Sequence, residues 1–273
     1  MRRTVIVSFL FLSLFFVRTA FSQPVTTPLR TPVIEVSYGF PSGGMKDLPT
    51  SLATPGSLSL SLGLERQLKT QYSANILDYA EPYVFLGYFR DAGGNSGRDE
   101  VSASLWRFGL GAKDGFSYRV GGDLLILSCN SAWTWSRLSL KETPADSVSR
   151  LRLERFDGRF RYGTLTEAGI TYQFGTSFSV GAGYERTLVY PSYIFLEAVG
   201  SHAIQLVAHG VAGEIVKAIF PASPTLGPIA HFILKNGLNI GLYELRRSNV
   251  NWPFRSARPL FLDNVTLSVS VFL

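Results

Sequence analysis

Six charged side chains lie on the polar side of alternating polar and apolar runs, and they are the best candidates for chemistry in this chain. They are Glu35, Glu65, Arg107, Arg119, Glu167 and Glu185. Carboxylate and guanidinium groups on one face can pair with each other, or they can line a passage that selects charged solutes. In the strand pairing given below, Glu167 lies opposite Glu185, and these like charges repel unless a cation or a basic side chain lies between them. The six residues therefore indicate either a network of paired charges or a narrow polar pore.

The remaining reactive side chains form no catalytic or metal-binding pattern. His202, His209 and His231 lack a third ligand at a recognisable spacing, so we expect no metal and no cofactor. Ser201 and His202 are adjacent, but neighbours on a strand point to opposite faces, which argues against a catalytic contact. Cys129 is the single cysteine, and we expect it to be a small apolar packing residue. The sequence also lacks P-loop, HExxH, CxxC and GxSxG motifs, so an enzyme is the weakest functional reading.

The segments that hold the charged candidates alternate with a period of two. Residues 34–40 read I-E-V-S-Y-G-F, and residues 58–64 read L-S-L-S-L-G-L. Residues 265–273 read V-T-L-S-V-S-V-F-L. Side chains on a strand point alternately to its two faces, so each run has one apolar face and one face dominated by small or polar residues. We therefore expect strands, with Val265, Leu267, Val269 and Val271 on the apolar face of the last one.

Three candidate hairpins extend this sorting along the chain. Three-residue turns at 113–115, 175–177 and 235–237 bring apolar residues opposite apolar residues, as Phe174 lies opposite Phe178. The other face collects mainly Gly, Ser, Thr and Asn. A soluble β-sandwich usually fills its polar face with Lys, Glu and Thr, and aromatic residues near strand ends are typical of membrane barrels. We therefore predict that the apolar face contacts lipid.

The first residues predict export from the cytoplasm. Arg2 and Arg3 precede an apolar run at 5–17, and residues 20–22 read A-F-S, so 1–22 has the three parts of a secretory signal peptide. The apolar run is shorter than the roughly 20 residues that a spanning helix needs. We expect a short lead-in at 23–30 and a single transmembrane domain at 31–273.

The composition fits a protein with a partly apolar surface. Charged residues make up 17% of the chain, whereas about 25% is usual in soluble domains. Removal of three arginines with the signal peptide leaves 23 basic residues against 20 acidic ones, a net charge of +3. This charge is too small to indicate binding to nucleic acid.

Turn lengths predict an antiparallel up-and-down sheet of about twelve strands, within a range of roughly ten to fourteen. Bacterial barrels have short turns on the inner, periplasmic side and long loops on the outer side. The expected inner turns are 66–71, 113–115, 141–147, 175–177 and 235–237. The expected outer loops are 41–56, 90–99, 128–131, 157–165, 189–227 and 248–262. Residues 189–227 could form a folded loop, a plug or another hairpin, and 213–220 within them could form a short helix. Residues 150–162 could form a tight hairpin.

In its alternation, short turns and terminal strand, the chain resembles the broad family of bacterial outer-membrane β-barrel proteins. Members commonly end in Phe or Trp, which the assembly machinery is understood to read, whereas Phe272 is penultimate here and Leu273 is last. The resemblance implies an all-β transmembrane barrel in the outer membrane. It also implies outer-membrane lipid and the barrel-assembly machinery as partners.

Three functions are compatible with such a barrel. The first is a porin-like channel or transporter for a small polar solute, which the inward charges favour. The second is a structural or surface-binding barrel with a plugged lumen that acts through its outer loops. The third is an outer-membrane lipid hydrolase. The sequence specifies neither a substrate nor an oligomeric state.

Overall fold

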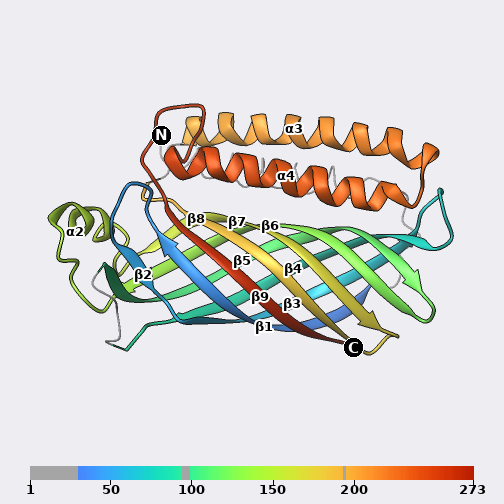
Figure 1. The fold of residues 1–273 in the computed structure, drawn as a ribbon, viewed down its shortest axis with the longest axis horizontal. Coiled ribbons are helices and arrows are strands. Elements are labelled where there is room, and N and C mark those ends of the chain that lie inside the picture. Colours follow the sequence, from blue (N-terminus) through green and yellow to red (C-terminus); the bar gives the residue numbers. More distant parts are fainter. Residues whose placement is uncertain (1–29, 94–98, 193–194) are drawn as a thin grey trace, which may run out of the picture.

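Eight long strands form the body of the molecule in this computed structural model, which describes residues 30–93, 99–192 and 195–273. They are β1 (Thr31–Gly44), β3 (Gly56–Lys69), β4 (Ile76–Arg90), β5 (Glu100–Val120), β6 (Asp123–Leu140), β7 (Phe160–Phe174), β8 (Phe178–Val189) and β9 (Leu260–Phe272). Each strand pairs antiparallel with its neighbours, and β1 also pairs with β9, so the sheet closes into a ring (Figure 1). The predicted signal peptide, 1–22, and residues 23–29 of the lead-in lie outside the described residues.

The ring closes through the terminal strand that the alternation predicted. Val36 of β1 lies opposite Val269 of β9, and Ser37 lies opposite Ser268. Val269 points outward and is about half exposed, whereas the next residue, Ser270, is buried inside the ring. The predicted apolar face of β9 is therefore confirmed. Because each long strand has two partners, closure leaves no long open edge of unpaired backbone.

The two ends of the ring differ in the length of their connections. Short turns join the strands at the end where β1 begins and β9 ends, which we call the short-turn end; they are residues 70–75, 121–122 and 175–177. Long connections join them at the opposite end, which we call the long-loop end; they are residues 45–55, 91–99, 141–159 and 190–259. The long-loop end also holds the short strand β2 (Ser51–Ala53) and the helix α2 (Ser147–Leu153).

Two long helices lie along the outside of the ring (Figure 1). α3 (Phe195–Ala222) starts from the long-loop end, and α4 (Leu226–Ser248) returns beside it. α4 contacts β5, β6, β7 and β8, whereas α3 packs mainly on α4. We call the pair the α3–α4 hairpin. Both helices belong to the single connection between β8 and β9.

Several predicted connections are confirmed. The turn at 175–177 joins β7 and β8 with Phe174 opposite Phe178, as expected. Gly175 has a φ of +53°, a backbone conformation that glycine adopts without steric cost. The turn expected at 66–71 lies slightly later, at 70–75. The outer loops expected at 41–56 and 90–99 contain two of the connections at the long-loop end, residues 45–55 and 91–99.

The turn predicted at 113–115 is wrong. β5 continues through these residues, and Asp114 pairs with Cys129 in the middle of β6. The loop expected at 128–131 is wrong for the same reason. A three-residue turn and an unbroken strand both keep the apolar residues of this segment on one face. Alternation alone therefore cannot distinguish the turn from the strand.

The hairpin predicted around 235–237 is also wrong, because this segment lies inside α4. Its apolar residues fit a period of two over a short window, but His231, Lys235 and Asn239 recur every four residues and share one side of a helix. Residues 189–227 hold all of α3, which includes the short helix considered at 213–220 and extends well beyond it. The all-β prediction therefore holds for the ring but not for its connections. Within the described residues the sheet has nine strands, so the predicted count of about twelve is wrong.

Residues 150–162 form the end of α2 and the start of β7, so the tight hairpin predicted there is wrong. Asp146 begins α2, because its carboxylate accepts the backbone N–H of Ser149 at 2.7 Å. This bond holds the pKa of Asp146 below its usual value. Residues 141–147 consequently lie at the long-loop end rather than on the expected inner side. The outer loop expected at 157–165 is shorter than predicted, because β7 begins at Phe160.

The continuous course of β5 can be tested with a disulfide. Asp114→Cys places a second thiol directly opposite Cys129, at the ~5 Å Cα spacing that a disulfide accepts. We expect mild oxidation to remove both free thiols without dimerisation, as measured by maleimide labelling of the denatured protein. Ala112→Cys is the matched control, because its partner is Ser131 and its diagonal distance from Cys129 is too long. Equal labelling of both variants would mean that Asp114 does not pair with Cys129.

Candidate functional site

The interior of the ring is organised around Arg107 of β5. Its guanidinium group makes two hydrogen bonds with the carboxylate of Glu185 on β8, at 2.5 and 2.7 Å. The strands are not neighbours, so the pair crosses the interior. The guanidinium also lies 4.7 Å from the ring centroid of Phe89, and Arg107 is only 2% exposed. This is a bidentate, desolvated ion pair, the strongest geometry that these two groups can adopt.

A second ion pair crosses the interior closer to the short-turn end. The ammonium group of Lys113 lies 2.9 Å from Glu35 and 3.3 Å from Glu81. Glu81 also accepts a 2.5 Å hydrogen bond from the hydroxyl of Tyr79, and Glu35 accepts one from Ser270 at 3.2 Å. The sequence reasoning missed Lys113 and Glu81. The alternation predicts a turn through Lys113, whereas β5 continues through it and turns its side chain to the inward face.

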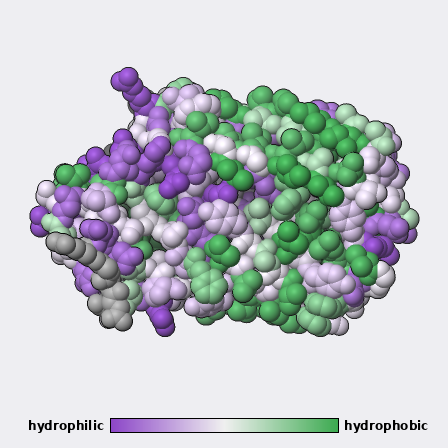
Figure 2. All heavy atoms as spheres, viewed as in Figure 1, coloured by the Kyte–Doolittle hydropathy of each residue, from purple (hydrophilic) through white to green (hydrophobic). Residues whose placement is uncertain are grey.

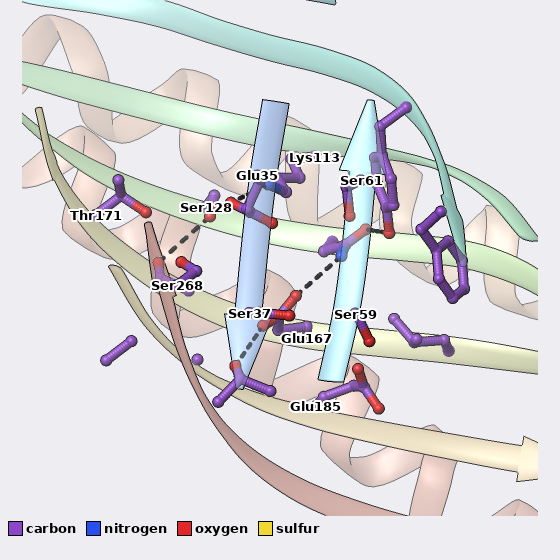
Figure 3. A pocket seen from close by; sticks show the side chains of 18 of the residues that line it. Glu35, Ser37, Ser59, Ser61, Lys113, Ser128, Glu167, Thr171, Glu185 and Ser268 are labelled. Carbon is purple, nitrogen blue, oxygen red and sulfur yellow. Dashed lines mark hydrogen bonds and ion pairs between the residues drawn. The ribbon is translucent and has the colours of Figure 1, made fainter. Parts of the chain in front are cut away.

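Glu167 and Glu185 lie opposite each other, as the predicted register required. Their like charges are separated by different partners: Glu185 binds Arg107, whereas Glu167 accepts bonds from Asn130 and Thr266, both at 3.0 Å. Figure 3 shows Glu167 and Glu185 with Glu35 and Lys113 around the same interior space. The network hypothesis is therefore the one that the geometry fits.

The other two predicted residues lie nearer the short-turn end. Glu65 is buried on the inward face, where it accepts a 2.6 Å bond from Gln67, which in turn bonds to Gln173 across the ring. Arg119 is on the inward face of β5 but is exposed close to the end of that strand. The structure thus brings five of the six predicted residues into the interior and leaves Arg119 at its rim.

The long-loop end of the interior is closed by an apolar cluster, which we call the plug. Its buried members are Met45, Leu52, Phe89, Ala103, Leu105, Leu138, Leu153, Phe156, Val189, Leu260 and Leu262. β2 covers this cluster by pairing with both β1 and β5, and α2 contributes Leu153.

The space left inside the ring is a polar cavity. It measures about 610 Å³ including the adjoining solvent, and its lining includes Glu35, Arg107, Lys113, Glu167 and Glu185 (Figure 3). A ring of eight strands is just wide enough for its own side chains to fill. The cavity is consequently divided by side chains that bond to each other across it.

The histidines and the Ser–His pair lie outside this network, on the α3–α4 hairpin. Ser201 accepts hydrogen bonds from Arg246, whereas the Nδ1 atom of His202 lies 2.7 Å from the carbonyl oxygen of Ala198. The two side chains therefore have separate partners and do not form a catalytic pair. Among the described residues, no group of three or more His, Cys, Asp or Glu side chains could hold a metal ion. Cys129 is buried, as expected for a packing residue.

Comparison with known proteins gives likeness in structure alone. No family model matches the chain, and no curated protein matches its sequence. The chain is similar to the crystal structure of neisserial surface protein A (NspA), with 9% identity and a TM-score of 0.42, covering 88% of this chain and 96% of that one. It is also similar to Ail, the attachment invasion locus protein of Yersinia pestis, with 8% identity and a TM-score of 0.36, covering 89% and 99%.

Removal of one partner from the central ion pair should destabilise the fold. We expect Arg107→Gln to lower the free energy of unfolding by about 3 kcal/mol, because Glu185 would remain buried and charged without its partner. Urea titration in detergent micelles measures this change. The double variant Arg107→Met, Glu185→Leu should recover most of the loss.

Arg119→Gln is the matched control, because Arg119 is an exposed arginine on the same strand and face. We expect its effect to stay within about 0.5 kcal/mol. Equal stability of the two single variants would show that the central ion pair contributes nothing to the fold.

Proposed function

We propose that this protein is an outer-membrane β-barrel with a closed lumen, and that it acts at the cell surface through its long-loop end. The observation that carries the proposal is the interior itself. One buried and one partly buried ion pair cross the lumen, and the apolar plug covers the end above them. The barrel is then a rigid support for the segments displayed at the long-loop end.

The outward face of the ring supports the membrane location. Large apolar side chains project from neighbouring strands and are each about half exposed: Val36, Leu60, Leu86, Trp106, Phe108, Leu267 and Val269. Monomeric soluble proteins rarely expose a continuous apolar surface of this kind. Figure 2 shows apolar residues over much of the ring and polar residues gathered around the long-loop end. Bacterial barrels have short periplasmic turns and longer extracellular loops, so in this proposal the long-loop end faces the outside of the cell.

The same interior disfavours the small-solute channel that we expected from the inward charges. A channel needs a continuous wet path, whereas Arg107, Glu185 and Glu81 are almost fully buried and bonded. The lipid hydrolase is disfavoured because Ser201 and His202 bond to different groups. The surface-binding alternative needs neither an open lumen nor a catalytic pair.

The chemistry of the displayed segment favours an anionic partner. Three exposed arginines lie on α2 or within the six residues that follow it: Arg150, Arg155 and Arg159. Two nearby acids are occupied by backbone bonds, since Asp146 accepts the N–H of Ser149 and Asp157 accepts the N–H of Leu140. We propose that this segment binds a sulfated or phosphorylated polymer through its guanidinium groups.

A closed lumen predicts that the protein conducts no ions across a membrane. Folded wild-type protein in a planar lipid bilayer should give no stepwise current, because the ion pairs and the plug block the passage. A variant with Phe89 and Leu105 changed to Ala and with Arg107 and Glu185 changed to Ser is the positive control, since it removes side chains from both the plug and the central ion pair and should admit brief openings. Stable conductance by the folded wild type would instead support the channel.

Surface binding can be measured on whole cells that display the protein. We expect fluorescent dextran sulfate to bind cells carrying the wild type, and the triple variant Arg150→Gln, Arg155→Gln, Arg159→Gln to weaken this binding roughly tenfold. Binding should also fall with added salt. Arg119→Gln is the control, because Arg119 lies at the opposite end of the barrel and should have no effect. Unchanged binding by the triple variant would exclude α2 as the binding segment.

A further inference from the structure

The α3–α4 hairpin presents apolar side chains away from the ring. On α3, Val207 is 69% exposed, and Leu206, Val211 and Ile215 are also exposed. The exposed apolar residues of α4 include Ile229, Ile233, Ile240 and Leu245. Burial of each such side chain away from water is favourable, so a surface of this kind indicates an apolar environment around it.

Several polar side chains of the hairpin point the other way. Ser201 of α3 and His231, Asn236, Asn239 and Arg246 of α4 are all buried. A helix on the surface of a water-soluble protein has the opposite arrangement, with its apolar stripe facing the core. Polar groups that face inward, with apolar groups facing outward, are typical of helices in lipid.

The apolar stretch of α3 has the length of a membrane. Residues 198–213 contain no Asp, Glu, Lys or Arg, and Glu197 and Glu214 border them. At 1.5 Å per residue these two acids are about 25 Å apart along the helix, which equals the ~25 Å height of the apolar band of outer-membrane barrels. Glu214 is exposed and pairs with Lys217 at 2.7 Å. The segment Glu197–Ala222 is long and apolar enough to cross a membrane.

Contacts at both ends hold α4 along the wall of the ring. Near the short-turn end, the Tyr118 hydroxyl donates to the carbonyl oxygen of Thr225 at 2.6 Å, and Lys235 forms an ion pair with Asp114. Near the long-loop end, the Tyr243 hydroxyl donates to Asp263 at 2.7 Å. α4 therefore follows the ring over most of its height and does not bend away from it.

α3 is joined to α4 through a buried arginine. The guanidinium group of Arg246 donates to the hydroxyl and carbonyl oxygens of Ser201, at 2.9 and 3.0 Å, and to the side chain of Gln205 at 2.7 Å. Interhelical bonds of this type hold helices together where lipid offers no polar partner. The polar atoms of Ser201, Gln205 and Arg246 are thus turned toward protein, whereas the outer side of α3 between Glu197 and Glu214 is apolar.

We propose that the α3–α4 hairpin lies within the outer membrane beside the barrel, with its outward apolar side chains against lipid acyl chains. The inference rests on the proposed outer-membrane location and extends it from the strands to two helices. Lipid is the occupant that the structure favours, because the exposed apolar surface continues from the ring onto the hairpin (Figure 2). Figure 1 shows the helices parallel to the long dimension of the ring.

Spin labels can locate the hairpin in the full chain reconstituted in phospholipid vesicles. In a Cys129→Ala background, one label is attached at Val207→Cys on α3, and Val211→Cys replaces it if that variant does not fold. Leu60→Cys on the outward face of β3 is the membrane control, and Leu151→Cys on α2 is the aqueous control. Collision rates with oxygen, which concentrates in lipid, and with a water-soluble nickel chelate are measured at each position. We expect oxygen collisions to exceed nickel collisions at Val207 and Leu60, and the reverse at Leu151.

Each other result overturns the proposal in a distinguishable way. Nickel access at Val207 with oxygen access at Leu60 would place the hairpin outside the bilayer and leave the barrel in the membrane. Nickel access at both positions would remove the membrane location itself. Protection of Val207 from both reagents would show that protein, such as a second copy of the chain, covers α3.

Discussion

The pairing of β1 with β9 is the constraint on which the rest of the structure depends. It gives every long strand two neighbours, so the backbone of the ring needs no partner outside it. Closure with so few long strands also makes the interior narrow, and side chains from opposite walls meet there. Arg107 reaches Glu185 across this space, and Lys113 reaches Glu35. The bonds that divide the interior are thus a consequence of the size of the ring.

The direction of each interior side chain could be predicted from sequence, whereas its partner could not. Period-two alternation is a local property, and it placed Glu35, Arg107 and Glu185 correctly on the inward face. Pairing across the ring depends on the number of strands and on their order, which alternation does not contain. Lys113 is an example. The predicted turn takes it away from the inward face, so the alternation does not identify it as the cation that neutralises Glu35.

The full length of α3 and the whole of α4 could not be predicted for a different physical reason. Ala230, Phe232 and Leu234 alternate as a strand would, and a window of this length fits both periods. The polar residues carried the deciding signal, because the spacing of His231 and Lys235 matches one side of a helix. In a water-soluble protein the polar side of a helix faces solvent. Here the polar side of α4 faces the ring instead, as the ion pair between Lys235 and Asp114 shows.

The plug and the ion network act as one unit. Phe89 belongs to the plug, yet its ring lies 4.7 Å from the guanidinium group of Arg107. An apolar cover excludes water from the ion pair, and a lower local dielectric strengthens the attraction between Arg107 and Glu185. The ion pair in turn neutralises charges that would otherwise draw water under the plug. The plug covers the network at the long-loop end, where the connections would otherwise let water in, so each part of the closed interior depends on the other.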